Sequence, residues 1–151
     1  MAEFTDSYST RTKSGNIAEV KAMEYFQAKD DLYCCRFGFD EGENRIPIVH
    51  FNKIPKVLRN TPDLIVIKEK TRFVEVKGCK NVLRVKVGDM NSYDFWNGLA
   101  DLYFFVLDVS TMKHKIFPYK NIKELADRGY LDVDVYPDNL KEYYKLPFST
   151  I

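Results

Sequence analysis

The segment from residue 62 to residue 77, PDLIVIKEKTRFVEVK, decides the fold of this chain. It contains two apolar runs of strand character, residues 62–67 and 73–77. The short polar stretch between them, Glu69-Lys70-Thr71, fits a tight hairpin connection. The sequence therefore predicts two neighbouring strands in the core of a sheet.

Charged side chains stand within these apolar strands. Alternate side chains of a strand share a face, so Phe73, Glu75 and Lys77 are expected to point one way, while Asp63 enters from the neighbouring strand. Charges on an apolar central strand are costly unless they are paired or bind a metal ion. Asp63, Glu75 and Lys77 therefore indicate a site. The alternative is a solvated Glu75–Lys77 pair on an edge strand, with Pro62-Asp63 in a turn.

The segments around these strands predict a mixed α/β layer arrangement. Asn16 is a good N-cap for the first helix. The cluster Tyr93-Asp94-Phe95-Trp96 is expected to pack in the core, with DNA or subunit contact as the alternative. The expected elements are a helix at 16–29, a strand at 32–39, a turn at 40–44, a short strand at 46–51, an irregular loop with a helical turn at 52–61, a strand or extended loop at 82–87, a helix at 89–98 capped by Asp89 and stopped by Gly98, a buried strand at 102–109, a return strand at 115–118 and a helix at 121–128.

The length of 151 residues suits one domain. We expect residues 1–15 to form a flexible basic arm and residues 16–151 a single domain with an aromatic C-terminal tail. The tail either forms a subunit contact or covers one face of the core. No apolar run reaches the ~18 residues of a membrane helix, and the N-terminus has no signal-peptide core. Three cysteines without CxxC spacing fit reduced thiols, so we expect a cytoplasmic protein with no membrane contact.

Basic side chains are concentrated between residues 45 and 86. This block carries 11 basic and 3 acidic residues, a net charge of +8, while the rest of the chain carries −7. Such a block is typical of a protein that binds a polyanion, although lysines that protect an exposed strand edge are an equal alternative. The candidate DNA contacts are the basic residues of the N-terminal arm and of this block: Arg11, Lys13, Lys53, Lys56, Arg59, Lys80, Arg84 and Lys86.

The acids of the two strands suggest a metal ion. Neighbouring carboxylates repel each other unless a cation holds them. Carboxylate and carbonyl oxygens suit a hard divalent ion, so Asp63 and Glu75 predict a site for Mg²⁺, with Mn²⁺ also suitable. Such an ion can polarise a phosphoryl oxygen and lower the pKa of bound water. Lys77 can orient the attacking water or stabilise charge that develops on the phosphate.

The residues of this candidate site resemble the signature of a known family. Pro62-Asp63, eleven intervening residues and then Glu75-Val76-Lys77 look like the signature of the PD-(D/E)xK nuclease superfamily. Gly15-Asn16-Ile17-Ala18-Glu19 resembles the helix start of its Holliday-junction-resolvase-like branch, in which an upstream acid, here Glu19, joins the site. From an Asn16 cap, Glu19 could also be a capping-box partner.

The resemblance implies a restriction-endonuclease-like fold, a mixed sheet flanked by helices with an αβββαβ core. It implies Mg²⁺-dependent phosphodiester hydrolysis with Asp63, Glu75 and Glu19 as metal ligands and catalytic residues. It further implies the backbone carbonyl of Val76 as a ligand and Lys77 as the residue that assists the attacking water. In-line attack would release a 3′ hydroxyl and a 5′ phosphate.

We therefore expect a DNA endonuclease associated with nucleoid or phage DNA. The basic block and the enlarged 40–61 region favour site-specific cutting, as in homing or restriction enzymes, and the 15–19 match favours Holliday junction resolution as the alternative. An RNA-directed nuclease and a non-catalytic nucleic-acid-binding module stay open. Cutting both strands of double-stranded or branched DNA implies a homodimer or a higher symmetric oligomer.

Overall fold

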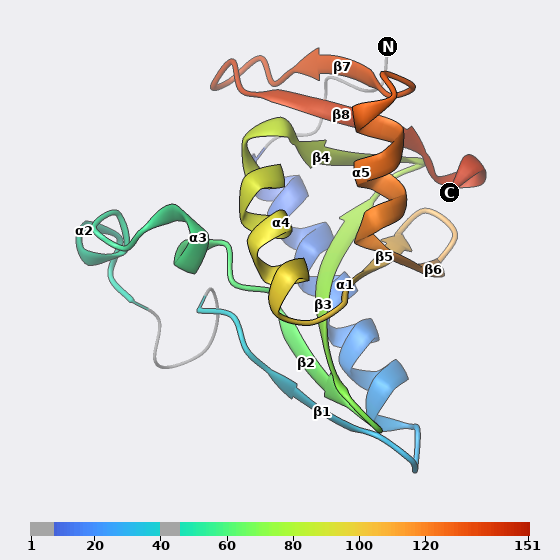
Figure 1. Cartoon of the computed structure of the whole chain (residues 1–151). Helices are drawn as coiled ribbons and strands as arrows, with labels where there is room; N and C mark the ends of the chain where they lie inside the picture. Colours follow the sequence, from blue (N-terminus) through green and yellow to red (C-terminus); the bar gives the residue numbers. More distant parts are fainter. Residues whose placement is uncertain (1–7, 40–45) are drawn as a thin grey trace.

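The computed structural model describes residues 8–39 and 46–151. Their strands form two sheets, and helices lie on both faces of the larger one (Figure 1). The helices are α1 (Tyr8–Gln27), α2 (Ile48–Phe51), α3 (Lys56–Arg59), α4 (Met90–Leu99) and α5 (Tyr119–Asp127), with short 3-10 turns at Val87–Asp89 and Phe148–Thr150. The strands are β1 (Tyr33–Arg36), β2 (Leu64–Ile67), β3 (Thr71–Cys79), β4 (Val82–Lys86), β5 (Leu102–Asp108), β6 (Lys113–Pro118), β7 (Asp132–Val135) and β8 (Glu142–Pro147).

The larger sheet is mixed and has the strand order β1-β2-β3-β5-β6. β1, β2 and β3 are antiparallel neighbours, β5 runs parallel to β3, and β6 returns antiparallel along β5. The connection from β3 to β5 contains α4, since parallel strands need a crossover connection. The α/β class and the predicted αβββαβ order, here α1-β1-β2-β3-α4-β5, are confirmed.

Two apolar cores form on opposite faces of this sheet. On one face, small and aromatic residues of α1 pack against Val74 and Val76 of β3. On the other face, Tyr93 and Trp96 of α4 pack with Phe73 of β3. The alternation predicted for residues 73–77 is therefore confirmed, as is the core position of Tyr93 and Trp96. Phe95 was expected in the same core, but it is exposed, because it lies on the opposite side of α4 from Tyr93.

α1 approaches β3 very closely at Gly78. A Cβ atom added at Gly78 would lie 2.3 Å from the backbone carbonyl oxygen of Ser14 in α1. No side chain fits into that space, so the absence of a side chain at Gly78 allows α1 to lie this near to the sheet.

The first helix starts earlier than the sequence predicted. It begins at Tyr8, so residues 8–15 are helical and do not belong to a flexible arm. Asn16 lies inside the helix and is not its N-cap. Glu19 is therefore not a capping-box partner, which removes the alternative role that the sequence left open for it.

A second, antiparallel sheet has the order β4-β8-β7. Leu83 and Val85 of β4 and Leu146 of β8 enter the same core as α4. Residues 82–86 are thus a strand, one of the two predicted states. Tyr143 and Phe148 are buried, so the aromatic tail covers the core, also one of two predicted roles.

Residues 46–51 contradict their prediction. They were expected as a strand, but residues 48–51 form the helical turn α2. The carbonyl oxygen of Pro47 accepts hydrogen bonds from the N–H groups of His50 and Phe51, each at 2.9 Å. The fixed φ of a proline suits the start of a helical turn. The predicted turn at 40–44 lies outside the described residues.

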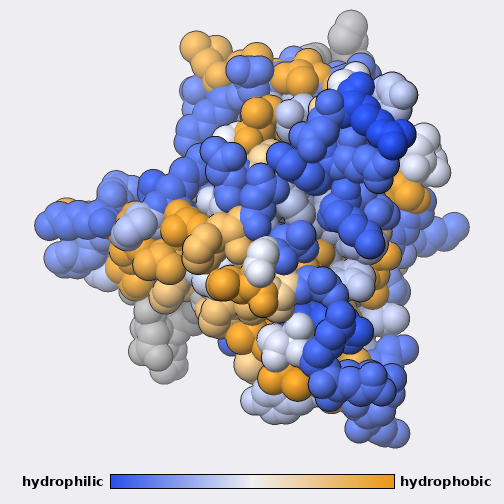
Figure 2. Space-filling model, viewed as in Figure 1, coloured by the Kyte–Doolittle hydropathy of each residue, from blue (hydrophilic) through white to orange (hydrophobic). Residues whose placement is uncertain are grey.

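Residues 46–61, called here the α2–α3 arm, project from the body of the molecule beside α4 (Figure 1). The predicted helical turn within 52–61 is present as α3. The indole N–H of Trp96 donates to the carbonyl oxygen of Val57 at 2.9 Å, which ties α3 to α4. On the face shown in Figure 2, apolar side chains gather around α3 and the adjoining end of α4, where Leu58, Phe95 and Leu99 are exposed.

The cysteines carry free thiols, and Cys34 and Cys79 are buried. Burial raises the pKa of Cys34 to about 11 and that of Cys79 to about 12. These thiols are therefore protonated at neutral pH. Within residues 8–39 and 46–151, no helix has the length and apolar character needed to cross a bilayer.

Candidate active site

The candidate site forms where β2 and β3 separate. Their pairing ends at Leu64 and Val74, and Asp63 lies one residue before that pair. Oδ2 of Asp63 accepts a 2.7 Å hydrogen bond from the N–H of Val76. The carboxylate thus takes the place of the backbone carbonyl that a paired strand would offer to this N–H. In a ladder, the N–H and C=O of one residue face the same neighbour, so the carbonyl of Val76 lies on the side of Asp63.

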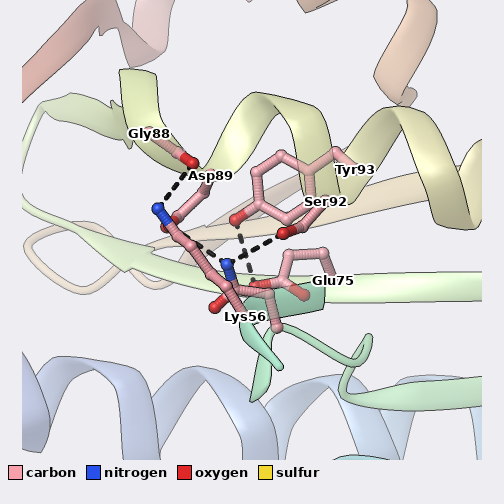
Figure 3. A network of polar contacts seen from close by, with 7 residues as sticks. Lys56, Glu75, Gly88, Asp89, Ser92 and Tyr93 are labelled. Carbon is pink, nitrogen blue, oxygen red and sulfur yellow. Dashed lines mark hydrogen bonds and ion pairs between the residues drawn. The ribbon is translucent and has the colours of Figure 1, made fainter. Parts of the chain in front are cut away.

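Glu75 and Lys77 project together from β3 toward α4. Nζ of Lys77 lies 3.1 Å from Oε1 of Glu75, and the two side chains are only 26% and 12% exposed. The hydroxyl of Tyr93 in α4 donates to the same Oε1 at 3.4 Å (Figure 3). Because β3 lies between β2 and β5, the alternative of a solvated pair on an edge strand is wrong.

The carboxylates of Asp63 and Glu75 influence each other. Burial and the charge of Glu75 raise the pKa of Asp63 well above its ordinary value. The hydrogen bond from Val76 and the charge of Lys77 oppose this rise, and Glu19 adds to it. Buried acids that repel each other in this way are stabilised by a cation placed between them.

Lys77 and Tyr93 keep their protons. Burial opposes the charge of Lys77, but the carboxylates of Glu75, Asp89 and Asp63 around it raise its pKa above the ordinary value. Burial and Glu75 raise the pKa of Tyr93 in turn. At neutral pH, Lys77 can therefore orient a water molecule or stabilise negative charge, but it cannot accept a proton. The neutral phenol of Tyr93 acts as a donor.

Glu19 lies on α1 and contacts a residue that the sequence had not indicated. Its Oε2 accepts a hydrogen bond from Nη1 of Arg36 in β1 at 3.1 Å. Among the described residues, no three His, Cys, Asp or Glu side chains form a group that could hold a metal ion. The structure thus brings Asp63 and Glu75 together and pairs Glu19 with Arg36, so a ligand role for Glu19 stays a prediction.

The donor set still fits a hard divalent cation. Mg²⁺ keeps several waters and is commonly bound through one or two carboxylates rather than by a cage of protein ligands. Asp63 and Glu75 supply two carboxylates, and the carbonyl of Val76 lies on the same side. Burial and the charge of Glu75 raise the pKa of Asp63, and a cation at this point would offset both effects. These residues are suited to Mg²⁺ or Mn²⁺.

The predicted DNA contacts differ in exposure. The side chain of Arg11 is not among those that the structure describes. Arg59 and Arg84 are half-buried, and the guanidinium of Arg84 lies 5.6 Å from the centroid of the Tyr143 ring. The remaining predicted contacts are exposed lysines: Lys13, Lys53, Lys56, Lys80 and Lys86.

Lys56 also holds the α2–α3 arm in place. Its Nζ donates to the carbonyl oxygen of Gly88 at 2.7 Å and lies 3.8 Å from Oδ1 of Asp89 (Figure 3). Nδ2 of Asn60 donates to Asp89 Oδ1 and to Ser92 Oγ, each at 3.2 Å. Asp89 precedes α4 as predicted, but it makes no capping hydrogen bond and binds the arm instead.

Sequence reasoning missed the contacts of Tyr93, Asp89 and Arg36 with the site. Asp89 and Tyr93 are four residues apart, which brings side chains to one helix face. The spacing could have predicted that Asp89 and Tyr93 share a helix face. It could not have predicted that this face lies against β3. Arg36 offers no local signal, because its partner Glu19 lies on another element.

Neither a protein-family model nor a curated protein matches the chain. Among solved structures, a nuclease from a fusselovirus matches with a TM-score of 0.54 and 14% identity, over 92% of this chain and 83% of that chain. The Holliday junction resolvase Hjc of the archaeal hyperthermophile Archaeoglobus fulgidus matches with a TM-score of 0.51 and 15% identity, over 90% of this chain and 85% of that chain. At these identities the likeness is one of fold. The chain has the restriction-endonuclease-like fold, as residues 62–77 predicted.

Proposed function

We propose that this chain is a metal-dependent endonuclease that hydrolyses phosphodiester bonds in DNA. The observation that carries the proposal is the grouping of Asp63, Glu75 and Lys77 where β2 and β3 separate. Likeness in fold to a viral nuclease and to a junction resolvase supports it. A non-catalytic nucleic-acid-binding module would have no need for two carboxylates and a lysine in so shielded a place.

Each residue of the site has a role in the proposed hydrolysis. Asp63 and Glu75 would hold Mg²⁺ or Mn²⁺, with the carbonyl of Val76 and the carboxylate of Glu19 as further candidate ligands. When bound, the ion would polarise the scissile phosphate and lower the pKa of the attacking water. The protonated Lys77 orients that water and stabilises the charge that develops on the phosphate.

Two DNA substrates are candidates. The exposed lysines of the α2–α3 arm, Lys53 and Lys56, support site-specific cutting of duplex DNA of the homing or restriction type. Branched DNA is the second candidate. It is supported by Glu19 of α1, near enough to raise the pKa of Asp63, and by the likeness in fold to the resolvase Hjc.

A cut in both strands needs two copies of the site, so we propose a homodimer or a higher symmetric oligomer. The exposed apolar residues of α3 and α4, Leu58, Phe95 and Leu99, are the candidate contact (Figure 2). Sedimentation equilibrium measures the subunit number, and a monomer at all concentrations would contradict this part of the proposal. We infer a cytoplasmic location, in contact with nucleoid or phage DNA.

The test is a cleavage assay. The protein is incubated with long duplex DNA, a four-way junction and RNA of matched sequence, in Mg²⁺, Mn²⁺ or EDTA, and the product ends are mapped. We expect cleavage of DNA in both metals and none in EDTA. Discrete fragments from duplex DNA favour the site-specific role, and preference for the junction favours the resolvase role. Cleavage in EDTA, or of RNA alone, contradicts the proposal.

A further inference from the structure

We infer that Tyr93 is a positioning residue for Glu75 and that its hydroxyl fixes the carboxylate in the orientation that receives the metal ion. The inference rests on the proposed function, because that function makes Glu75 a metal ligand. It assigns a role in the site to a residue of α4, outside the acid-x-lysine pattern of β3.

Two donors from different elements reach one oxygen of Glu75. The hydroxyl of Tyr93 approaches Oε1 at 3.4 Å from α4, and Nζ of Lys77 approaches the same atom at 3.1 Å from β3. Figure 3 shows the contact between Tyr93 and Glu75 on the face of the sheet that α4 covers, and Lys77 lies on the same face, near the Tyr93 ring. Two contacts from two directions restrict the rotation of the carboxylate, which the ammonium alone would not do.

The ring of Tyr93 is itself held rigidly. Tyr93 is 2% exposed. Its ring makes an edge contact with the ring of Phe104 at 5.2 Å between centroids and a tilted contact with the ring of Tyr119 at 5.6 Å. Nζ of Lys77 lies 5.8 Å from the ring centroid. A donor fixed by core packing stays aligned with its acceptor, which is the kind of support that a precise metal site requires.

The same core contains a matched control. Tyr119 is 1% exposed and packs against the ring of Tyr93. Its hydroxyl donates to Oδ1 of Asp94 at 2.7 Å and contacts the carbonyl oxygen of Met90 at 3.2 Å. Tyr119→Phe therefore removes a buried hydroxyl from the same aromatic cluster without removing a contact to Glu75.

The measurements compare the wild type, Tyr93→Phe and Tyr119→Phe. Mn²⁺ affinity is measured without DNA by electron paramagnetic resonance, single-turnover cleavage is measured in Mg²⁺, and DNA affinity is measured in EDTA. Loss of a partner that orients a metal ligand typically costs about 10–100-fold in metal affinity or activity. Because the bond is long, we expect about a tenfold loss of Mn²⁺ affinity and cleavage rate in Tyr93→Phe, with unchanged DNA affinity.

Tyr119→Phe should keep both the Mn²⁺ affinity and the cleavage rate. A second variant with p-aminophenylalanine at position 93 keeps a donor on the ring and should restore Mn²⁺ affinity. Three outcomes overturn the inference. Tyr93→Phe could bind Mn²⁺ with wild-type affinity, or Tyr93→Phe and Tyr119→Phe could lose Mn²⁺ affinity equally. The third is a wild-type protein that binds no Mn²⁺. If the wild type binds Mn²⁺ but cleaves no nucleic acid, the proposed function fails, while the Mn²⁺ comparison still decides the role of Tyr93.

Discussion

The ammonium of Lys77 lies 3.1 Å from Glu75 and 5.8 Å from the ring centroid of Tyr93, and its side chain is half-buried. Lys77→Ala removes the positive charge that would stabilise the transition state. We expect single-turnover cleavage to fall by about a hundredfold or more, while DNA binding in EDTA is retained. Lys141→Ala, at an exposed lysine outside the predicted DNA contacts, is the control and should cleave normally. Normal cleavage by Lys77→Ala would remove the lysine from the mechanism.

Asp63 makes the metal-free protein less stable. Because burial and Glu75 raise its pKa above the unfolded value, the protonated form is favoured by folding. The contribution of Asp63 to the free energy of unfolding is therefore most favourable below the unfolded pKa of about 4 and is lost as pH rises through the folded pKa. Asp63→Asn keeps an oxygen that can accept the hydrogen bond from Val76 but carries no charge. We expect it to raise the melting temperature at pH 7 in EDTA.

The same variant should lose the stabilisation that Mg²⁺ or Mn²⁺ gives to the wild type, since a ligand that binds only the folded state raises its stability. Thermal melting with and without metal, at several pH values, measures both effects. The control is Asp101→Asn, because the hydrogen bond from Lys70 lowers the pKa of Asp101, so its neutralisation should not stabilise the protein. A full metal-induced shift in Asp63→Asn would exclude Asp63 as a ligand.

At the scale of elements, the contact between α1 and β3 depends on Gly78. An alanine there would bring its Cβ within 2.3 Å of the Ser14 carbonyl oxygen, so α1 must move away from the sheet. We expect Gly78→Ala to destabilise the protein by about 1–3 kcal/mol. In α4, Gly98 has open space around its Cβ position, and Gly98→Ala should stabilise the helix by about 0.5–1 kcal/mol. Urea unfolding measures both, and equal effects would contradict the close contact.

The α2–α3 arm contains two lysines of different roles. Lys53 is exposed, whereas Lys56 donates to Gly88 and holds α3 against the start of α4. If Lys53 contacts phosphate, Lys53→Ala should lower the salt dependence of DNA binding by about one unit of slope and leave melting unchanged. Lys56→Ala should also lower the melting temperature, by about 2–4 °C. Binding titrations across salt concentrations and thermal melting distinguish the two, and identical behaviour would show that Lys56 is not an anchor.

At the scale of the whole molecule, the end of the chain completes the core on the face that α4 covers. Phe148 is 8% exposed, and Nζ of Lys115 in β6 donates to its carbonyl oxygen at 2.6 Å. Phe148→Ala should therefore cost about 3–5 kcal/mol, measured by urea unfolding. The control is Leu140→Ala, because Leu140 is 75% exposed and should cost little. A small effect of Phe148→Ala would mean that the tail is dispensable for the core.

Much of the fold was predictable because its signals are local. The apolar alternation of residues 73–77 identified β3, and the polar stretch 69–71 identified the hairpin that joins β2 to β3. The apolar run at 102–109 identified β5. The predictions that were wrong also have local causes. The start of α1 was missed because residues 8–15 are mainly polar, and α2 replaced a strand because Pro47 begins a helical turn.

The sequence by itself determined the core order of helices and strands, the pairing of β2 with β3 and the common face of Glu75 and Lys77, because each depends on residues close together in the chain. Only the tertiary structure decided that β8 pairs with β4, that Tyr93 meets Glu75 and that Arg36 meets Glu19. These contacts join elements far apart in sequence. They follow from how both faces of the sheet are covered, which no local pattern of residues encodes.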